Sequence, residues 1–213
     1  MKREMNEERL GTAPLGRLMV SLALPAVAAQ LINVLYNIVD RIYIGHIHGY
    51  GDVALTGVGV TFPIIMLISA FSAFAGMGGA PLASIELGKR DIRKAELILG
   101  NSAGMIVLFS VVLMVGFTVF KTPVLYAFGA SEVTISYAES YIGIYLAGTI
   151  FVQVAVGLNT FISGQGESKV AMLSVVIGAV LNICLDPLLI FALDMGVRGA
   201  ALATVISQAV SAA

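Results

Sequence analysis

Two aspartates stand inside stretches of sequence that are otherwise apolar enough to be buried in lipid. Asp40 lies in NVLYNIVDRIYIG and Asp186 lies in VLNICLDPLLIFAL. Because a charged side chain at membrane depth is unfavourable, such residues usually line a transport path, relay protons or bind ions. The two carboxylates are therefore the first candidates for chemistry, either as protonation sites or as ligands of a small cation.

Four polar residues of the first apolar stretch recur at helical spacing, since Gln30, Asn33, Asn37 and Asp40 are 3, 4 and 3 positions apart. At about 100° per residue they fall within an arc of roughly 80° on one helix face, and Tyr36 borders that face. Hydrocarbon cannot satisfy such polar groups, so the face must meet protein or water. It indicates the wall of an aqueous cavity that ends at Asp40, or a polar seam between helices.

A second polar pair lies further along the chain, where Asn182 and Asp186 are four positions apart and share one helix face. Asp40 and Asp186 each lie about two turns before the outer end of their segment, and Thr204 lies about two turns into the next one. We therefore expect these oxygens in one layer of the membrane, with Asn182 about one turn deeper. Such a cluster predicts a site for Na⁺ or a proton, although a structural hydrogen-bonded cluster would show the same pattern. Asn159 is expected to face the same cavity.

Composition places the chain in a membrane. Of its 213 residues 58% are hydrophobic and 12% are charged, whereas soluble domains carry about 25% charged residues. The formal net charge of −1 gives no support for a nucleic-acid partner. Apart from Na⁺ at the acidic cluster, no metal and no cofactor is predicted. Intramembrane aspartyl proteases carry their acids in YD and GxGD patterns, whereas these two lie in IVDR and CLDP, so we expect no enzyme.

Five apolar segments are long enough to cross a bilayer, because a spanning helix needs roughly 20 apolar residues. A sixth segment is shorter and leads us to expect a truncated sixth helix. The expected organisation is an N-terminal segment at 1–17 and a six-helix unit at 18–213, with helices at about 18–45, 54–85, 98–120, 134–162, 168–193 and 197–213.

Lysine and arginine set the expected orientation. They gather before the first span and in the loop after the second, as in ELGKRDIRKAE. The positive-inside rule then predicts a cytoplasmic N-terminus in a multi-pass protein of the cell (inner) membrane, in contact with membrane lipid. Two prolines are predicted hinges, because proline removes a backbone hydrogen bond and bends a helix. Pro25 lies well inside the first span, and Pro187 directly follows Asp186.

Three stretches resemble the bacterial branch of the multidrug and toxin extrusion (MATE) family. They are PAVAAQLINVLYNIVDRIYIGHIHG, GMGGAPLASIELGKRDIRKAE and NTFISGQGESKVAMLSVVIGAVLNICLDPLLIF. The resemblance covers essentially the whole chain, but only the N-terminal half of such a transporter. It implies an all-α membrane protein of twelve helices in two six-helix lobes, of which this chain supplies the first. The C-terminal lobe is expected from the same full-length chain or from a second copy.

The resemblance also implies a function and a site. It assigns a cation site to Asp40, Asn182, Asp186 and Thr204, and it places Tyr36 and Asn159 in the adjoining cavity. The implied activity is secondary active multidrug efflux, in which H⁺ or Na⁺ is exchanged for amphipathic organic cations. Two alternatives stay open: a lipid-linked sugar flippase of the wider superfamily, and an inactive half-transporter fragment.

Overall fold

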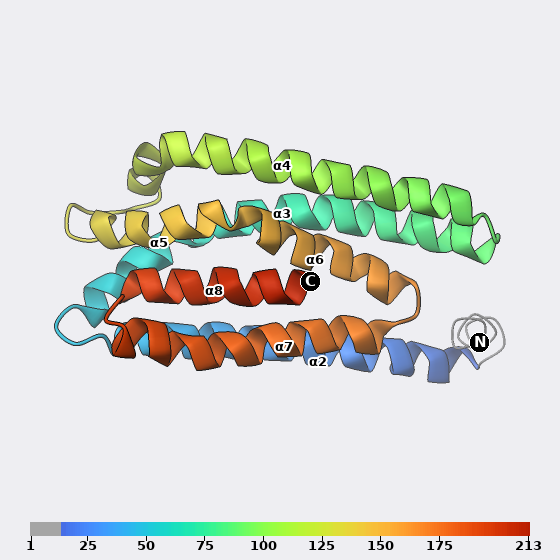
Figure 1. Ribbon diagram of the computed structural model, residues 1–213, viewed down its shortest axis with the longest axis horizontal. Helices are drawn as coiled ribbons and strands as arrows, with labels where there is room; N and C mark the ends of the chain where they lie inside the picture. Colours follow the sequence, from blue (N-terminus) through green and yellow to red (C-terminus); the bar gives the residue numbers. More distant parts are fainter. Residues whose placement is uncertain (1–13) are drawn as a thin grey trace.

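The computed structural model describes residues 14–213, which form helices and turns and contain no strand. The predicted cytoplasmic segment at 1–17 therefore lies mostly outside the described residues. The helices run lengthwise beside one another in an elongated bundle (Figure 1). This arrangement suits a bilayer, where each backbone N–H and C=O must be paired within its own segment.

Four helices are long enough and apolar enough to cross a membrane, or five spans if one bent pair is counted as a single span. The helices are α2 (Leu15–Gly45), α3 (Gly51–Gly88), α4 (Ile92–Ala127), α5 (Ile135–Ala147), α6 (Thr149–Gly164), α7 (Ser168–Pro187) and α8 (Val197–Ala212). A short π-helical segment, η1 (Leu188–Ala192), continues α7. The shorter α8 is apolar but falls below the length of a full span.

The bundle has two outer layers with helices between them. Helix α2 packs chiefly against α7, and α3 packs against α4 and α6. Helix α8 lies between these layers and contacts α5, α6 and α7, as Figure 1 shows with α8 enclosed by its neighbours. Small residues allow this close approach, since α8 buries Gly199, Ala200, Ala201 and Ala203.

Glycine also brings α3 and α6 into close contact. A Cβ atom on Gly76 of α3 would lie 2.6 Å from the carbonyl oxygen of Gly157 on α6. A Cβ on Gly157 would in turn lie 2.6 Å from the Cδ1 atom of Ile106 on α4. Neither position has room for a side chain, so these glycines set the spacing of three helices.

The predicted span at 134–162 corresponds to two helices, α5 and α6, between which the chain bends by 60°. The break falls at Gly148, where an added Cβ would lie 2.4 Å from both methyl groups of Val205 on α8. The hydroxyl of Thr149 donates to the carbonyl of Tyr145 near the end of α5, which also accepts from the backbone N–H of Gly148. The absence of a side chain at Gly148 thus allows α8 to pack directly against the bend.

The outer face of the bundle is strongly apolar. Large apolar side chains are exposed along α2, among them Leu24, Leu31 and Leu35. An exposed apolar surface of this extent is unusual for a soluble monomer and is typical of a surface that meets lipid or another protein.

Candidate cation site and cavity

Asn182 joins the two helices that carry most of the candidate cation site. Its Nδ2 atom donates to Oδ1 of Asp186, four residues later on α7, at 3.5 Å. The same Nδ2 atom donates to Oγ1 of Thr204 on α8, also at 3.5 Å. Asn182 is 1% exposed and Asp186 is 0% exposed. The structure therefore brings together three of the four residues predicted for the site, in a part of the bundle closed to solvent.

Asp40, the fourth predicted residue, comes from α2 and is 7% exposed. Its carboxyl group lies within electrostatic range of the Asp186 carboxyl group. The neighbouring Arg41 acts on Asp40 electrostatically but places its guanidinium over the Phe62 ring, 5.3 Å from the ring centroid. Within residues 14–213, neither acid forms an ion pair with a basic side chain. The two buried carboxyl groups, one on α2 and one on α7, are thus close enough to interact electrostatically, and we call them the acidic pair.

Three buried oxygens of this cluster have no hydrogen-bond partner in the described part of the chain. They are Oδ1 of Asp40, Oδ1 of Asn182 and Oδ2 of Asp186. Because buried polar atoms are almost always paired, such orphaned oxygens call for an explanation. A proton on a carboxyl group, or a small hard cation coordinated by oxygens, would satisfy them. The donor set therefore fits H⁺ or Na⁺, and residues 14–213 hold no group of three His, Cys, Asp or Glu side chains suited to another metal.

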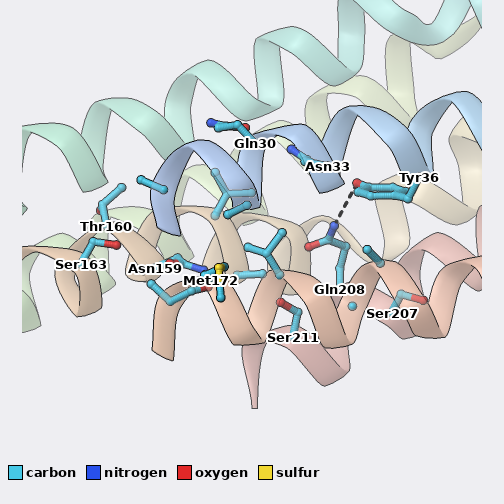
Figure 2. Close-up of a pocket in the computed structure, with 18 of the residues that line it drawn as sticks. Gln30, Asn33, Tyr36, Asn159, Thr160, Ser163, Met172, Ser207, Gln208 and Ser211 are labelled. Atoms are coloured by element: carbon cyan, nitrogen blue, oxygen red, sulfur yellow. Dashed lines mark hydrogen bonds between the residues drawn. The ribbon is translucent and has the colours of Figure 1, made fainter. Parts of the chain in front are cut away.

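A cavity of about 370 Å³ adjoins the cluster, between α2, α3, α6, α7 and α8 (Figure 2). Four of the five predicted cavity residues line it, namely Gln30, Asn33, Tyr36 and Asn159. Asn182 and Thr204 line it as well, whereas Asp40 and Asp186 do not. The acidic pair therefore lies outside the cavity lining, and Asn182, which lines the cavity, contacts one member of it, Asp186.

Asn37, the fifth predicted cavity residue, does not line this cavity. Its side chain is exposed, and its Nδ2 atom donates to the backbone carbonyl of Asn33 at 2.7 Å. Asn37 thus shares the polar face of α2 that the sequence indicates, but it is exposed outside the cavity lining.

Sequence reasoning missed a run of polar residues on α8 that also lines the cavity. These are Ser207, Gln208 and Ser211, which follow Thr204 at helical spacing. That spacing was the available signal, because residues three, four and seven positions apart share a helix face. The hydroxyls of Thr160 and Ser163 on α6 and of Ser168 on α7 complete the polar part of the lining.

Three hydrogen bonds fix two polar side chains, those of Gln208 and Asn159, at the cavity wall. Gln208 donates from Nε2 to the hydroxyl of Tyr36 at 3.4 Å, the dashed line in Figure 2. Asn159 donates from Nδ2 to the carbonyl of Ala171 at 3.1 Å and to the hydroxyl of Ser174 at 2.9 Å. The first bond joins α8 to α2, and the second pair joins α6 to α7.

The two predicted hinge prolines lie at different kinds of position. Pro25 is buried within α2, and the helix is continuous through it. Pro187 is the last residue of α7, immediately before the π-helical segment η1. Segments of π-helix are rare and frequently occur at functional sites. The role of Pro25 and Pro187 as hinges stays a prediction.

A GxGD pattern does occur at residues 49–52, as GYGD. It places Asp52 in the first turn of α3, where the residue is exposed, whereas Asp40 and Asp186 are buried. The pattern therefore adds no third acid to the buried pair.

Comparison with known proteins decides the family. The family model described as MatE matches residues 25–188, which include Asp40, Asn182 and Asp186. The chain belongs to the MatE family. This MatE-family chain is 29% identical over 193 residues to the multidrug export protein MepA of Staphylococcus haemolyticus, covering 91% of the chain and 42% of that relative.

Solved structures agree with this membership. A crystal structure of MATE in the bent conformation is 30% identical, with a TM-score of 0.85 over 92% of this chain and 43% of that one. A crystal structure of MATE in the straight conformation is 29% identical, with a TM-score of 0.84 over 91% of this chain and 42% of that one. The predicted all-α lobe of a MATE-type transporter is thereby confirmed, and this MatE-family chain is a multi-pass membrane protein. It spans less than half the length of the relatives it matches.

Proposed function

We propose that this lobe belongs to a secondary transporter that exports amphipathic organic cations in exchange for H⁺ or Na⁺. The observation that carries the proposal is the set of orphaned, buried oxygens on Asp40, Asn182 and Asp186, of which Asn182 also lines the cavity. Membership of the MatE family and the printed name of MepA, a multidrug export protein, support the same activity.

Binding of the cation changes the contact between α2 and α7. Without it, two carboxylates in a buried site repel one another, because charges interact strongly where the dielectric constant is low. A proton or Na⁺ removes part of that repulsion and allows α2 to approach α7 more closely. Helix α2 carries Asp40 and also lines the cavity through Tyr36, so its movement changes the space offered to a substrate.

The transport cycle alternates between two arrangements of α2, one with the cation bound and one without it. We propose that α2 bends near Pro25 when the cation is bound, which narrows the cavity and releases the substrate outward. Release of the cation to the cytoplasm restores the open cavity. A cation shifts such an equilibrium only as far as its affinities for the two arrangements differ. Crystal structures of MATE in a bent and in a straight conformation support the existence of two arrangements.

The proposal includes a second lobe and a membrane orientation. The relatives are more than twice as long as this chain, and we propose that a C-terminal lobe completes the transport pathway. We also propose that the protein lies in the inner membrane with its N-terminus in the cytoplasm, as the distribution of Lys and Arg in the sequence predicts.

The test uses the complete gene product in proteoliposomes with an imposed pH or Na⁺ gradient. Movement of ethidium, a fluorescent organic cation, is expected to depend on one of the two gradients. Asp40→Asn and Asp186→Asn should lower gradient-driven movement to the level of protein-free vesicles. The exposed Asp52 provides the control, and Asp52→Asn should transport normally. Unchanged gradient-driven movement in both pair variants would show the proposal to be wrong.

A further inference from the structure

Two exposed arginines lie where α3 meets α4, in a segment that we call the basic turn (residues 89–94). Arg90 lies between the two helices, and Arg93 lies in the first turn of α4. Within residues 14–213 neither arginine forms an ion pair, although the exposed Glu96 lies only three positions after Arg93. Both guanidinium groups, with five N–H donors each, are therefore available to an anion from outside the chain.

The other acids near the basic turn are already paired with its lysines. A carboxylate oxygen of Glu86 lies 2.7 Å from Nζ of Lys89, and one of Asp91 lies 3.1 Å from Nζ of Lys94. In each pair the two residues are three positions apart, so the contact is local. The positive charge that these pairs leave over is that of the arginines, and an anionic partner would complement it.

Arg90 occupies a backbone position that favours glycine. Its φ of 60° lies in the left-handed region, which a Cβ atom disfavours. The backbone N–H of Arg90 donates to the carbonyl of Leu87 at 2.9 Å, and the N–H of the next residue, Asp91, donates to the carbonyl of Glu86 at 2.9 Å. Helices commonly end with this pair of bonds, and glycine usually stands where Arg90 does. An unfavourable backbone conformation that glycine would relieve points to a role for the side chain.

The length of α3 places the basic turn beyond the hydrocarbon of a bilayer. The 38 residues of α3 extend about 57 Å at 1.5 Å per residue, whereas the hydrocarbon core is about 30 Å thick. Figure 1 shows the turn between α3 and α4 at one end of the bundle. Ile85, Ile92 and Leu97 are exposed on either side of it. Cationic groups beside exposed apolar side chains suit the level of the lipid head groups, where phosphate and acyl chain meet.

We propose that the basic turn binds the phosphate of an anionic phospholipid through the guanidinium groups of Arg90 and Arg93. A guanidinium can donate two parallel hydrogen bonds to one phosphate, which gives the contact a defined geometry. The N-terminus of α4 is not the anion site, because the carboxylate of Asp91 already accepts from the backbone N–H of Lys94. This lipid site requires neither the proposed transport cycle nor a particular orientation of the chain, since head groups lie on both sides of a bilayer.

The test is native mass spectrometry of the purified complete gene product in detergent. The protein is titrated with phosphatidylglycerol, which is anionic, or with phosphatidylcholine of the same acyl chains, which has no net charge. The unaltered protein should bind phosphatidylglycerol more tightly. Arg90→Gly and Arg93→Gln should each raise the Kd of phosphatidylglycerol about fivefold, as expected for one basic residue at an anionic surface. Neither should change the Kd of phosphatidylcholine.

Glycine at position 90 separates loss of binding from loss of folding. Arg90→Gly removes the side chain from a positive φ, so this variant should melt at or above the temperature of the unaltered protein while it binds phosphatidylglycerol less tightly. The matched control is Arg198, which is exposed in the first turn of α8. Helix α8 begins at the other end of the bundle (Figure 1), and Arg198→Gln should bind both lipids as the unaltered protein does.

A soluble phosphate distinguishes a lipid from a dissolved ligand. Glycerol 3-phosphate carries a phosphate but no acyl chains, and at the concentration of the lipid it should not displace phosphatidylglycerol. Displacement under those conditions would show that the basic turn binds a soluble phosphate and would overturn the lipid site. The lipid site is equally wrong if the unaltered protein binds both lipids with the same Kd, or if Arg198→Gln weakens binding as much as Arg90→Gly.

Discussion

Gln208 on the last helix and Tyr36 on the first described helix are hydrogen-bonded across 172 positions of sequence, with Nε2 of the amide 3.4 Å from the tyrosine hydroxyl. Helix α2 otherwise packs mainly on α7 and meets α8 at few places. The bond is thus a specific tie between the helix that carries Asp40 and the helix that carries Thr204.

This tie predicts a measurable coupling between its two residues. Gln208→Met and Tyr36→Phe each remove the bond with little change in volume. Because the distance is long for a hydrogen bond, we expect a coupling energy of only about 0.5 kcal/mol in a double-mutant cycle. The measurement is the denaturant-induced unfolding of the purified complete protein in detergent. Strictly additive effects of the two substitutions would show that the bond contributes nothing.

Thr204 should be required for its hydroxyl and not for its shape. Thr204→Val removes one of the two acceptors of Asn182 and leaves a buried amide less well paired, which costs about 1–3 kcal/mol. We expect the cation concentration that half-activates efflux to rise roughly tenfold. Thr204→Ser should restore it, and Thr56→Val, at an exposed site on α3, should have no effect. Normal activation in the valine variant would remove Thr204 from the cation site.

The glycine contact between α3 and α6 predicts a sharp steric effect. Gly76→Ala would place a Cβ 2.6 Å from the carbonyl oxygen of Gly157. Overpacking of this kind typically lowers the free energy of unfolding by about 1–3 kcal/mol. Gly104 on α4 is the control, because no atom lies within 4 Å of its Cβ position. Gly104→Ala should leave the melting temperature unchanged or raise it, and equal losses in both variants would contradict the packing.

Asp91 predicts a stability change that is confined to acid. Its carboxylate accepts a hydrogen bond from the backbone N–H of Lys94 at 3.1 Å and caps α4. That bond, and the ion pair with the Lys94 side chain, hold the pKa of Asp91 below its ordinary value of 3.8. A lowered pKa in the folded state means that the contribution is complete above the unfolded pKa and is lost as the pH falls through the folded one.

The corresponding measurement compares the melting temperatures of the unaltered protein and of Asp91→Ala between pH 3 and pH 8. The difference should be constant above about pH 5 and should shrink below the ordinary pKa of an aspartate. A difference that instead changed between pH 6 and pH 8 would exclude Asp91 as its source.

Local periodicity predicted the parts of the site that lie on one helix. Asn182 and Asp186 share a face because they are four positions apart. The same spacing would have placed Gln208 on the helix face of Thr204. Contacts between helices were harder to predict, because they depend on how far each helix is rotated and displaced. The depths estimated from the sequence placed Thr204 in the same membrane layer as Asp186. The hydrogen bonds from Asn182 to both side chains show that the two lie close together.

The bend at Gly148 had no comparable signal in the sequence. Apolar composition continues across it, so the pattern predicted one span at 134–162. The bend depends on Val205, which is far away in sequence and packs against the backbone at that position. Helix ends were also imperfectly predicted, since α4 extends from Ile92 to Ala127, beyond the apolar stretch at 98–120. Helices continue past the hydrocarbon into polar surroundings, where hydropathy gives no boundary.

Asp186 is fully buried, and no described basic side chain forms an ion pair with it. A monovalent cation that crosses the membrane by way of this carboxylate carries its charge through the membrane interior. If two such cations are exchanged for one monovalent organic cation, each turnover carries net current. The membrane potential then adds about 2.3 kcal/mol per 100 mV to the driving force for that exchange, so voltage as well as concentration would set the direction of transport.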